Sequence, residues 1–107
     1  ASQEAPSGYE ILKIATKGGA EILGRKDIGS LEVGKAADLF MININRLELA
    51  GAHLDPKSML ATVGFNRPVD YTIINGKIVV KDGMLCKIDE YKVAKKANKL
   101  VEKLVNI

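Results

Sequence analysis

The 107-residue sequence contains one cysteine, one histidine and no tryptophan, and aromatic residues make up only 5% of it. A single cysteine excludes an internal disulfide framework and a cysteine-based zinc site, and it favours a reducing, cytoplasmic setting. No apolar run approaches the ~20 residues that a membrane-spanning helix needs, so we expect no membrane partner. Residues 1–8 are polar, with neither a starting Met nor a basic apolar leader, so we expect a disordered or cut N-terminus there.

Charge is modest overall, with a formal net charge of +3, but it is unevenly distributed. Five lysines near the C-terminus alternate with valine, alanine and leucine at helical spacing: Lys92, Lys95, Lys96, Lys99 and Lys103. The pattern is typical of an amphipathic helix with a solvated basic face, and we expect it over 89–107, with Asp89 as its cap. Nucleic-acid binding would favour arginine or aromatic residues among the lysines. Apart from Tyr91 these are missing, so we expect no nucleic-acid partner.

The length allows one domain or part of one, and a hydrophobic content of 47% is ordinary for a globular protein. Ser7 and Glu10 have the spacing of a capping box, and the apolar stripe that follows predicts a helix over 9–24, with Gly24 at its end. The pair Gly18-Gly19 inside that helix costs about 1 kcal/mol per glycine relative to alanine. We therefore expect another element to approach the helix closely at this pair.

Residues 25–88 read as short strands with one short helix. We expect strands over 28–31, 39–44, 69–74, 77–80 and 84–88, and an irregular segment over 46–55. The strand over 39–44 is apolar almost throughout, which is typical of a strand covered on both faces. Asn75-Gly76 is a strong hairpin signal and Asp82-Gly83 marks a second turn. Asp55 and Pro56 predict the start of a short helix that extends to Val63.

No group of residues supports catalysis. Hydrolysis at a metal centre needs several converging His, Asp, Glu or Cys ligands, and His53 is the one histidine. The aspartates lie apart in the sequence, each at a turn or cap: Asp27, Asp38, Asp55, Asp70, Asp82 and Asp89. As a general base, His53 would need a partner and a pocket. Cys86 beside Lys87 reads as a plain strand cysteine. We therefore predict no catalytic and no metal-binding residue, and we assign no substrate-binding residue.

Residues 28–39, IGSLEVGKAADL, resemble the signature G-S-L-E-x-G-K-x-A-D-L near the C-terminus of metal-dependent amidohydrolases. Residues 11–24 resemble the A-T-x-x-G-A-x-x-L-G helix of that family. Residues 69–83 resemble its segment V-x-x-x-I-V-N-G-x-x-V-V-x-D-G, and Asp89-Glu90 also fits. Three shorter stretches, 16–20, 24–28 and 51–53, are most similar to the aminohydrolase branch, which includes 8-oxoguanine and guanine deaminases and hydroxyatrazine or chlorotriazine hydrolases.

The resemblance implies an α+β fragment. Residues 9–24 would be the last helix of a (β/α)8 barrel, 25–88 the C-terminal share of a composite β-sandwich, and 89–107 a terminal helix. It also implies that the parent enzyme hydrolytically removes an amino or similar group from a purine, pyrimidine or triazine ring, with Zn or Fe as its metal. The family's metal ligands precede this segment, so no cofactor is expected in the chain. Leu54 interrupts the family's His-Asp-Pro after His53, which weakens any transfer of a role to that histidine.

Two functions stay open. The chain is either the C-terminal, non-catalytic part of such an enzyme, or an independent binding or assembly module derived from the same sandwich. On the first reading its partners are the N-terminal and barrel portions of the parent enzyme. The parent would act on a small heterocyclic substrate, and a homo-oligomer is one assembly open to it. Open strand edges would then promote association of the isolated chain.

Overall fold

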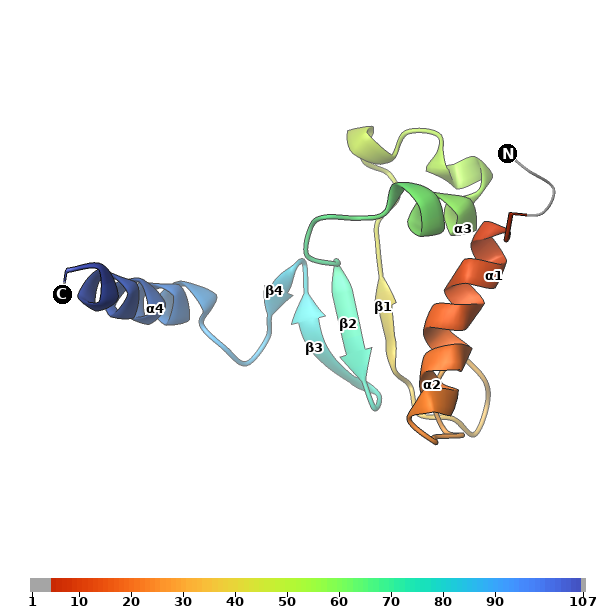
Figure 1. Cartoon of the computed structure of the whole chain (residues 1–107), viewed down its shortest axis with the longest axis horizontal. Coiled ribbons are helices and arrows are strands. Elements are labelled where there is room, and N and C mark those ends of the chain that lie inside the picture. The colour runs from red at the N-terminus through yellow and green to blue at the C-terminus, as the bar shows by residue number, and fades with distance from the viewer. Residues whose placement is uncertain (1–4, 107) are drawn as a thin grey trace.

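The computed structural model describes residues 5–106 and places a small antiparallel sheet between a helical N-terminal part and a single C-terminal helix (Figure 1). The α-helices are α1 (Gly8–Lys13), α2 (Gly19–Ile22), α3 (Pro56–Ser58) and α4 (Glu90–Val105), and the strands are β1 (Leu39–Met41), β2 (Tyr71–Ile74), β3 (Lys77–Lys81) and β4 (Met84–Leu85). Two π-helical turns, Ile14–Gly18 and Met59–Val63, and two 3-10 turns, Leu47–Leu49 and Ala52–Leu54, complete the elements.

The helix expected over 9–24 is present from Gly8 to Ile22, with the π-helical turn between α1 and α2. Its start is the expected capping box: Ser7 Oγ accepts a hydrogen bond from the Glu10 amide, and the Glu10 carboxylate accepts one from the Ser7 amide, both at 3.2 Å. Gly24, with a φ of +68°, follows the last helical turn, as predicted. The expectation about Gly18-Gly19 is not met, because no other element of the described chain lies within 4 Å of a Cβ built at either glycine.

Close approach occurs instead at Gly29, which the sequence had placed in a strand over 28–31. That strand prediction is wrong: residues 26–30 form a series of bends. Gly29 has a φ of +96°, a left-handed conformation that cannot continue a strand. A Cβ there would lie 2.9 Å from Ala20 Cβ and 3.1 Å from the Thr16 carbonyl oxygen. The bend therefore lets the loop backbone pack directly on the helix.

The sheet has the order β1-β2-β3-β4, and every neighbouring pair is antiparallel. Both predicted hairpins are confirmed. Asn75 and Gly76, then Asp82 and Gly83, each form a pair of positive φ angles, between +49° and +78°, as a tight I′ turn requires. The strands are shorter than expected. In particular, β1 ends at Met41 because the Asn43 amide donates to the Asp70 carboxylate, not to a neighbouring strand.

The strand register aligns apolar side chains on both faces of the sheet. Phe40, Thr72, Val80 and Leu85 form one row across the four strands, and Met41, Tyr71, Lys81 and Met84 form the neighbouring row on the opposite face. The prediction that 39–44 is covered on both faces is not met within residues 5–106, since Phe40 is 53% and Met41 44% exposed. The apolar pattern of this strand is therefore not explained by the part of the protein that the structure describes.

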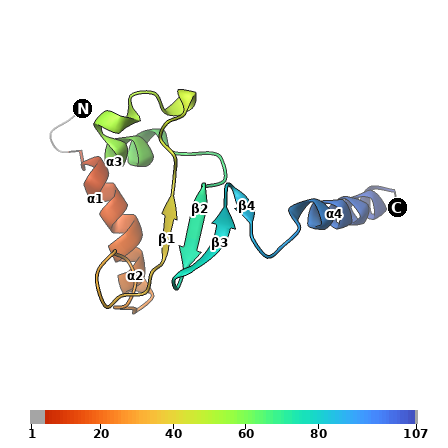
Figure 2. The same cartoon turned by 180° about the vertical axis from the view of Figure 1, so that it is seen from behind.

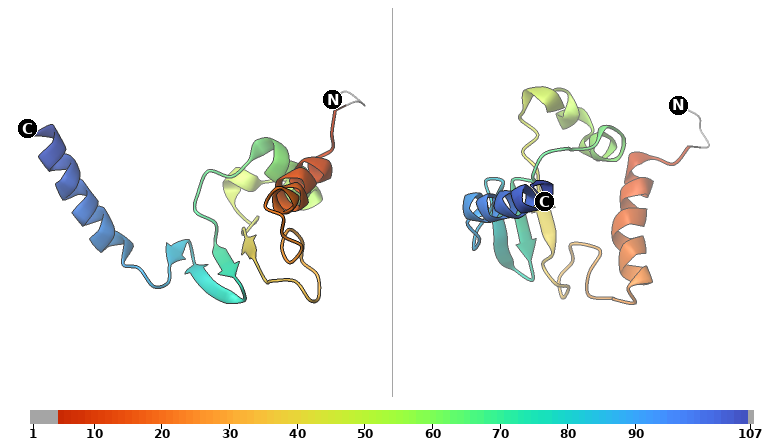
Figure 3. Two further views of the ribbon diagram at one scale, coloured as in Figure 1. Left: turned by 60° about the horizontal axis from the view of Figure 1, so that its bottom comes forward. Right: turned by 60° about the vertical axis from the view of Figure 1, so that its left-hand side comes forward.

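The chain is extended, and few of its apolar side chains are buried. Its radius of gyration is 18.1 Å and its dimensions are 55 × 34 × 29 Å, whereas a compact domain of this length would have a radius of about 13 Å. Among the described residues, the buried apolar ones are Ala20, Leu49 and Ala52. Helix α4 extends away from the sheet, at the opposite end from α1 (Figures 2 and 3). The accessible surface of the chain is 8,894 Å², against about 5,800 Å² expected for a folded monomer of this mass.

The N-terminal helix packs on the segment around α3. The main chain of Gly8 lies so close to Ser58 that a Cβ on Gly8 would be 2.8 Å from the Ser58 Cα. Beside this contact, Lys57 Nζ lies 4.6 Å from the centre of the Tyr9 ring, in cation–π geometry. Asp55 caps the short helix by accepting from the Ser58 amide, as the sequence predicted. Within residues 5–106, no helix has both the length and the apolarity to cross a membrane.

Candidate functional site

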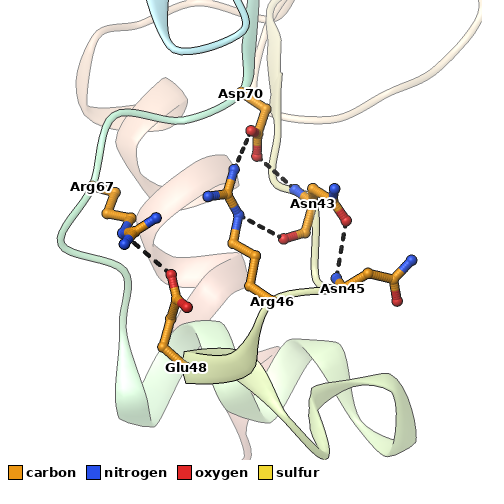
Figure 4. A network of polar contacts seen from close by, with 6 residues as sticks. All are labelled: Asn43, Asn45, Arg46, Glu48, Arg67 and Asp70. Atoms are coloured by element: carbon orange, nitrogen blue, oxygen red, sulfur yellow. Dashed lines mark hydrogen bonds and ion pairs between the residues drawn. The ribbon is translucent and has the colours of Figure 1, made fainter.

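A cluster of polar side chains connects the end of β1 to the start of β2 (Figure 4). The Asp70 carboxylate accepts from the Asn43 amide at 2.7 Å and pairs with the Arg46 guanidinium. Arg46 Nε in turn donates to the Asn43 carbonyl oxygen at 3.2 Å. Both charged side chains are mostly covered, with Asp70 20% and Arg46 24% exposed. The cluster satisfies the polar groups of a sharp corner, and both charges are used within it.

A second ion pair extends this cluster outward. Arg67 Nε lies 3.2 Å from Glu48 Oε1, and both side chains are about half exposed. Beside the pair is a shallow hollow of about 260 Å³, formed by Glu48 and Leu49 on one side and residues 63–67 on the other. The volume is near the lower end of small-molecule pockets. Because the two charged side chains of the hollow, Glu48 and Arg67, are already paired with each other, it offers few free groups to orient a substrate.

The loop over 28–39 contains a compact hydrogen-bonded triad. Ser30 Oγ donates to the Glu32 carboxylate at 2.5 Å and accepts from Lys35 Nζ at 2.8 Å, while Lys35 pairs with Glu32 at 2.9 Å. The hydrogen bond from Ser30, together with the hydrogen bond and charge of Lys35, lowers the pKa of Glu32 to about 2. Ser30, Glu32 and Lys35 are three of the four polar residues of the signature over 28–39. In this structure they bind one another and hold the turn around Gly34.

The last residues of that loop bind the hairpin between β2 and β3. Asp38 Oδ1 accepts from the Asn75 amide at 2.7 Å, and the Ala37 carbonyl oxygen accepts from the Gly76 amide at 3.0 Å. We call these two hydrogen bonds the hairpin clamp. It connects Asp38 and Asn75, which are 37 positions apart in the sequence. The signature over 28–39 and the segment over 69–83 are therefore joined in space by one main-chain hydrogen bond and by one that the Asp38 carboxylate accepts.

The individual candidates lie apart. His53 is exposed in the 3-10 turn Ala52–Leu54, and Cys86 is an exposed free thiol just after β4. Searching residues 5–106 finds no group of three or more His, Cys, Asp or Glu side chains that could hold a metal ion. That this chain contains no catalytic or metal-binding residue stays a prediction, because the positions of side chains do not test activity.

The aspartates divide into two groups. Asp55 and Asp89 cap helices, Asp82 occupies a turn, and Asp27 pairs with Arg25 at 2.6 Å, in accord with the turn-and-cap interpretation. Asp38 and Asp70 do more, because each binds a segment distant in sequence. Sequence reasoning also missed Arg46. The signal available for it was an arginine two positions after the apolar run over 39–44.

This arrangement is a framework of satisfied turns and corners beside large open apolar faces, without a cluster of unpaired reactive groups in the part described. Comparison with known proteins identifies that framework. A family model described as "Amidohydrolase family" matches residues 3–79, nearly three quarters of the chain. The chain belongs to the amidohydrolase family.

The relatives at the level of sequence are aminohydrolases and deaminases. A hydroxydechloroatrazine ethylaminohydrolase of Pseudomonas sp. (strain ADP) is 45% identical over 100 residues, which cover 94% of this chain and 21% of that protein. A 5′-deoxyadenosine deaminase of Methanobrevibacter smithii is 38% identical over 104 residues, covering 94% of this chain and 23% of its own length. The chain thus spans about a fifth of the length of the curated relatives it matches.

Solved structures agree. The atrazine chlorohydrolase of Arthrobacter aurescens TC1, solved in complex with zinc, superposes with a TM-score of 0.79 at 32% identity, over 89% of this chain and 21% of that one. An adenosine deaminase of Xanthomonas campestris with bound zinc gives a TM-score of 0.82 at 30% identity, over 94% of this chain and 23% of that one. The chain is an α+β fragment with an amidohydrolase fold, and its sheet has four antiparallel strands.

Proposed function

We propose that this chain is the C-terminal, non-catalytic part of a metal-dependent aminohydrolase. The parent enzyme would hydrolytically remove an amino or similar group from a purine, pyrimidine or triazine ring. In support, the relatives named above are an ethylaminohydrolase and deaminases, and the chain aligns with about a fifth of each. Within the parent, residues 9–24 would form the last barrel helix, 25–88 part of a composite β-sandwich, and 89–107 the terminal helix.

The observation that carries the proposal is the uncovered apolar surface. The total accessible surface of the chain is about 3,000 Å² larger than that of a compact monomer of its mass, an excess within the range that permanent interfaces bury. Both faces of the sheet contribute to it, through Phe40 and Ile74 (each 53% exposed) on one face and Met41 on the other. The remaining barrel and sandwich of the parent would cover this surface. Gly18 and Gly19, which no element outside their own helix approaches in the described chain, would then contact neighbouring barrel elements.

The implied metal does not fit the residues present here. Zinc in proteins is held by three or four N, S or O ligands that converge on one point, and residues 5–106 contain no such group. His53 is solitary and exposed. We therefore place the metal, and with it the chemical step, in the barrel portion of the parent, and we assign no step to this chain. We also propose that the parent works in the cytoplasm, where an exposed free thiol such as Cys86 stays reduced.

The alternative is an independent binding or assembly module. An independent module must bury enough apolar surface to offset the loss of conformational entropy on folding. Residues 5–106 bury three apolar residues, two of them alanines, which is few for that purpose. The structure thus favours the fragment over the module.

The deciding experiment uses a hybrid enzyme, in which this chain replaces the matching segment of the Pseudomonas ethylaminohydrolase. We expect the hybrid to hold about one zinc per chain, since a real site retains its ion tightly, and to hydrolyse hydroxydechloroatrazine. The isolated chain should retain less than about a tenth of an equivalent of zinc after removal of the excess, and it should associate or bind a hydrophobic dye. One tightly held zinc in the isolated chain would contradict the proposal. A monomeric, cooperatively folded isolated chain would favour the independent module.

The substrate of the parent is a separate question, because fold does not determine substrate. Full-length parent would be assayed for release of ammonia or alkylamine from hydroxydechloroatrazine, 5′-deoxyadenosine and adenosine. Turnover of one ring class and not the other would assign the substrate. If the parent hydrolysed none of the three compounds, the proposed ring chemistry would be contradicted. The assignment of this chain as a fragment would still be decided by the hybrid enzyme.

A further inference from the structure

The β2–β3 turn contains the one asparagine of the chain that precedes a glycine. The six asparagines are followed by isoleucine, arginine, arginine, glycine, lysine and isoleucine, in the order Asn43, Asn45, Asn66, Asn75, Asn98 and Asn106. Asn75 and Gly76 are both exposed. Glycine lacks a Cβ, so the main-chain nitrogen that follows Asn75 is less shielded than any other nitrogen after an asparagine in this sequence.

This pair of residues is chemically disposed to deamidation. The Gly76 nitrogen, once it has lost its proton to solvent, attacks the side-chain carbonyl carbon of Asn75. The carbon–nitrogen bond of the side-chain amide breaks, ammonia leaves, and a cyclic imide remains. Water then adds at one of the two imide carbonyls and opens the ring to aspartate or isoaspartate. The balance is one water consumed and one ammonia released, with no oxidant or other co-reactant.

We propose that Asn75 is a site of spontaneous deamidation, and that the hairpin clamp sets its rate. The Gly76 amide must be free to lose its proton and to turn toward the side chain. In the structure that amide donates to the Ala37 carbonyl oxygen at 3.0 Å. The neighbouring Asn75 amide donates to Asp38 Oδ1 at 2.7 Å, which fixes the left-handed conformation of Asn75 at a φ of +49°. Reaction therefore requires the clamp to open first.

Deamidation would in turn prevent the clamp from closing again. The product has a carboxylate at position 75, beside the Asp38 carboxylate that accepts the amide of the same residue. Two negative charges on neighbouring groups repel each other. The isoaspartate product also adds a carbon to the main chain, which a two-residue I′ turn does not accommodate. The modification would thus separate the hairpin from the loop over 28–39 and loosen β1 at the edge of the sheet.

The test follows deamidation of the full chain in mildly alkaline buffer, by mass spectrometry of the peptide that contains Asn75. The comparisons are Asp38→Ala, Asp89→Ala as a matched control that removes a distant helix cap, and a synthetic peptide of residues 72–79. Wild type should react at least about tenfold more slowly than the peptide, and Asp38→Ala should remove about a factor of ten, equivalent to about 1.4 kcal/mol of clamp stability. Asp89→Ala should react as wild type does.

Amide exchange of Asn75 and Gly76 in the same samples reports whether the clamp is closed, so a variant that fails to fold is recognised. Protection of both amides in wild type, combined with slow deamidation, supports the proposal. Reaction of wild type at the rate of the peptide overturns it. So does equal acceleration by Asp38→Ala and Asp89→Ala, since that would indicate general unfolding. The inference concerns this hairpin alone and does not depend on the enzyme proposed above.

Discussion

Two regions of the molecule differ in how far their groups are paired or buried within the chain. The first is the loop over 28–39 with the β2–β3 hairpin, and the second is the outer faces of the sheet with α4. In the first region the polar side chains of the signature have partners within the chain: the Ser30–Glu32–Lys35 triad and the hairpin clamp are both closed. In the second region, apolar side chains such as Phe40 and Leu104 are more than half exposed. The difference shows that local hydrogen bonding is self-contained here, whereas much of the apolar surface is left open within residues 5–106.

The largest effect is expected where the loop contacts the helix. Gly29→Ala forces a side chain into a left-handed conformation and places its Cβ 2.9 Å from Ala20 Cβ. We expect the local opening free energy of the loop in the hybrid enzyme to fall by about 2–4 kcal/mol. Gly34→Ala is the matched control, because Gly34 has a similar φ of +91° but open space around it, and it should cost only about 1–2 kcal/mol. Native-state hydrogen exchange measures both, and equal losses would show that the close contact is unimportant.

The exposed face of the sheet provides a prediction whose sign depends on the context. Phe40→Ser should reduce association and dye binding of the isolated chain, because the side chain is 53% exposed there. In the hybrid enzyme the same change should destabilise by about 1.5–3 kcal/mol, the value of burying a phenylalanine. Lys77→Ala, at an exposed position in β3 of the same sheet, should do neither. Thermal unfolding and sedimentation would check it, and a neutral effect of Phe40→Ser in the hybrid would argue against a covered face.

The corner between β1 and β2 should show a smaller loss. Asp70→Ala leaves the Arg46 guanidinium and the Asn43 amide without their acceptor, and we expect a loss of about 1–2 kcal/mol in the hybrid enzyme. Glu48→Ala breaks the more exposed pair with Arg67 and should cost less than about 1 kcal/mol. Chemical unfolding compares the two variants. An equal loss from both would mean that the burial of Asp70 contributes nothing.

The smallest effect is expected at the triad in the loop. The pKa of Glu32 is lowered to about 2 from an ordinary value of 4.5, so the carboxylate contributes stability above pH 4.5. This contribution should be lost as the pH falls from about 4.5 toward about 2. Lys35→Ala should raise the pKa of Glu32, and Lys26→Ala should leave it unchanged. Titration of the Glu32 carboxyl by NMR measures both, and an unshifted Glu32 in wild type would show that the triad does not form in solution.

Local signals predicted the turns and caps well because each depends on residues adjacent in sequence. Ser7 with Glu10, Asp55 with Pro56, Asn75-Gly76 and Asp89 all act where the sequence placed them. The prediction of a strand over 28–31 was wrong. Gly29 has a left-handed conformation and packs against the helix, but its neighbours in sequence are the same as those of a turn glycine beside a strand. The clamp from Asp38 to Asn75 and the pair of Arg46 with Asp70 could not be predicted, because each joins residues more than twenty positions apart.

The sequence by itself determined the element types at most turns, the family resemblance and the lack of a histidine-rich ligand set, because composition and short spacings carry that information. Only the tertiary structure decided that the signature residues bind one another and the hairpin, and that both faces of the sheet are open. These properties depend on which distant segments come together. That in turn depends on the burial of apolar surface, and residues 5–106 bury only three apolar side chains.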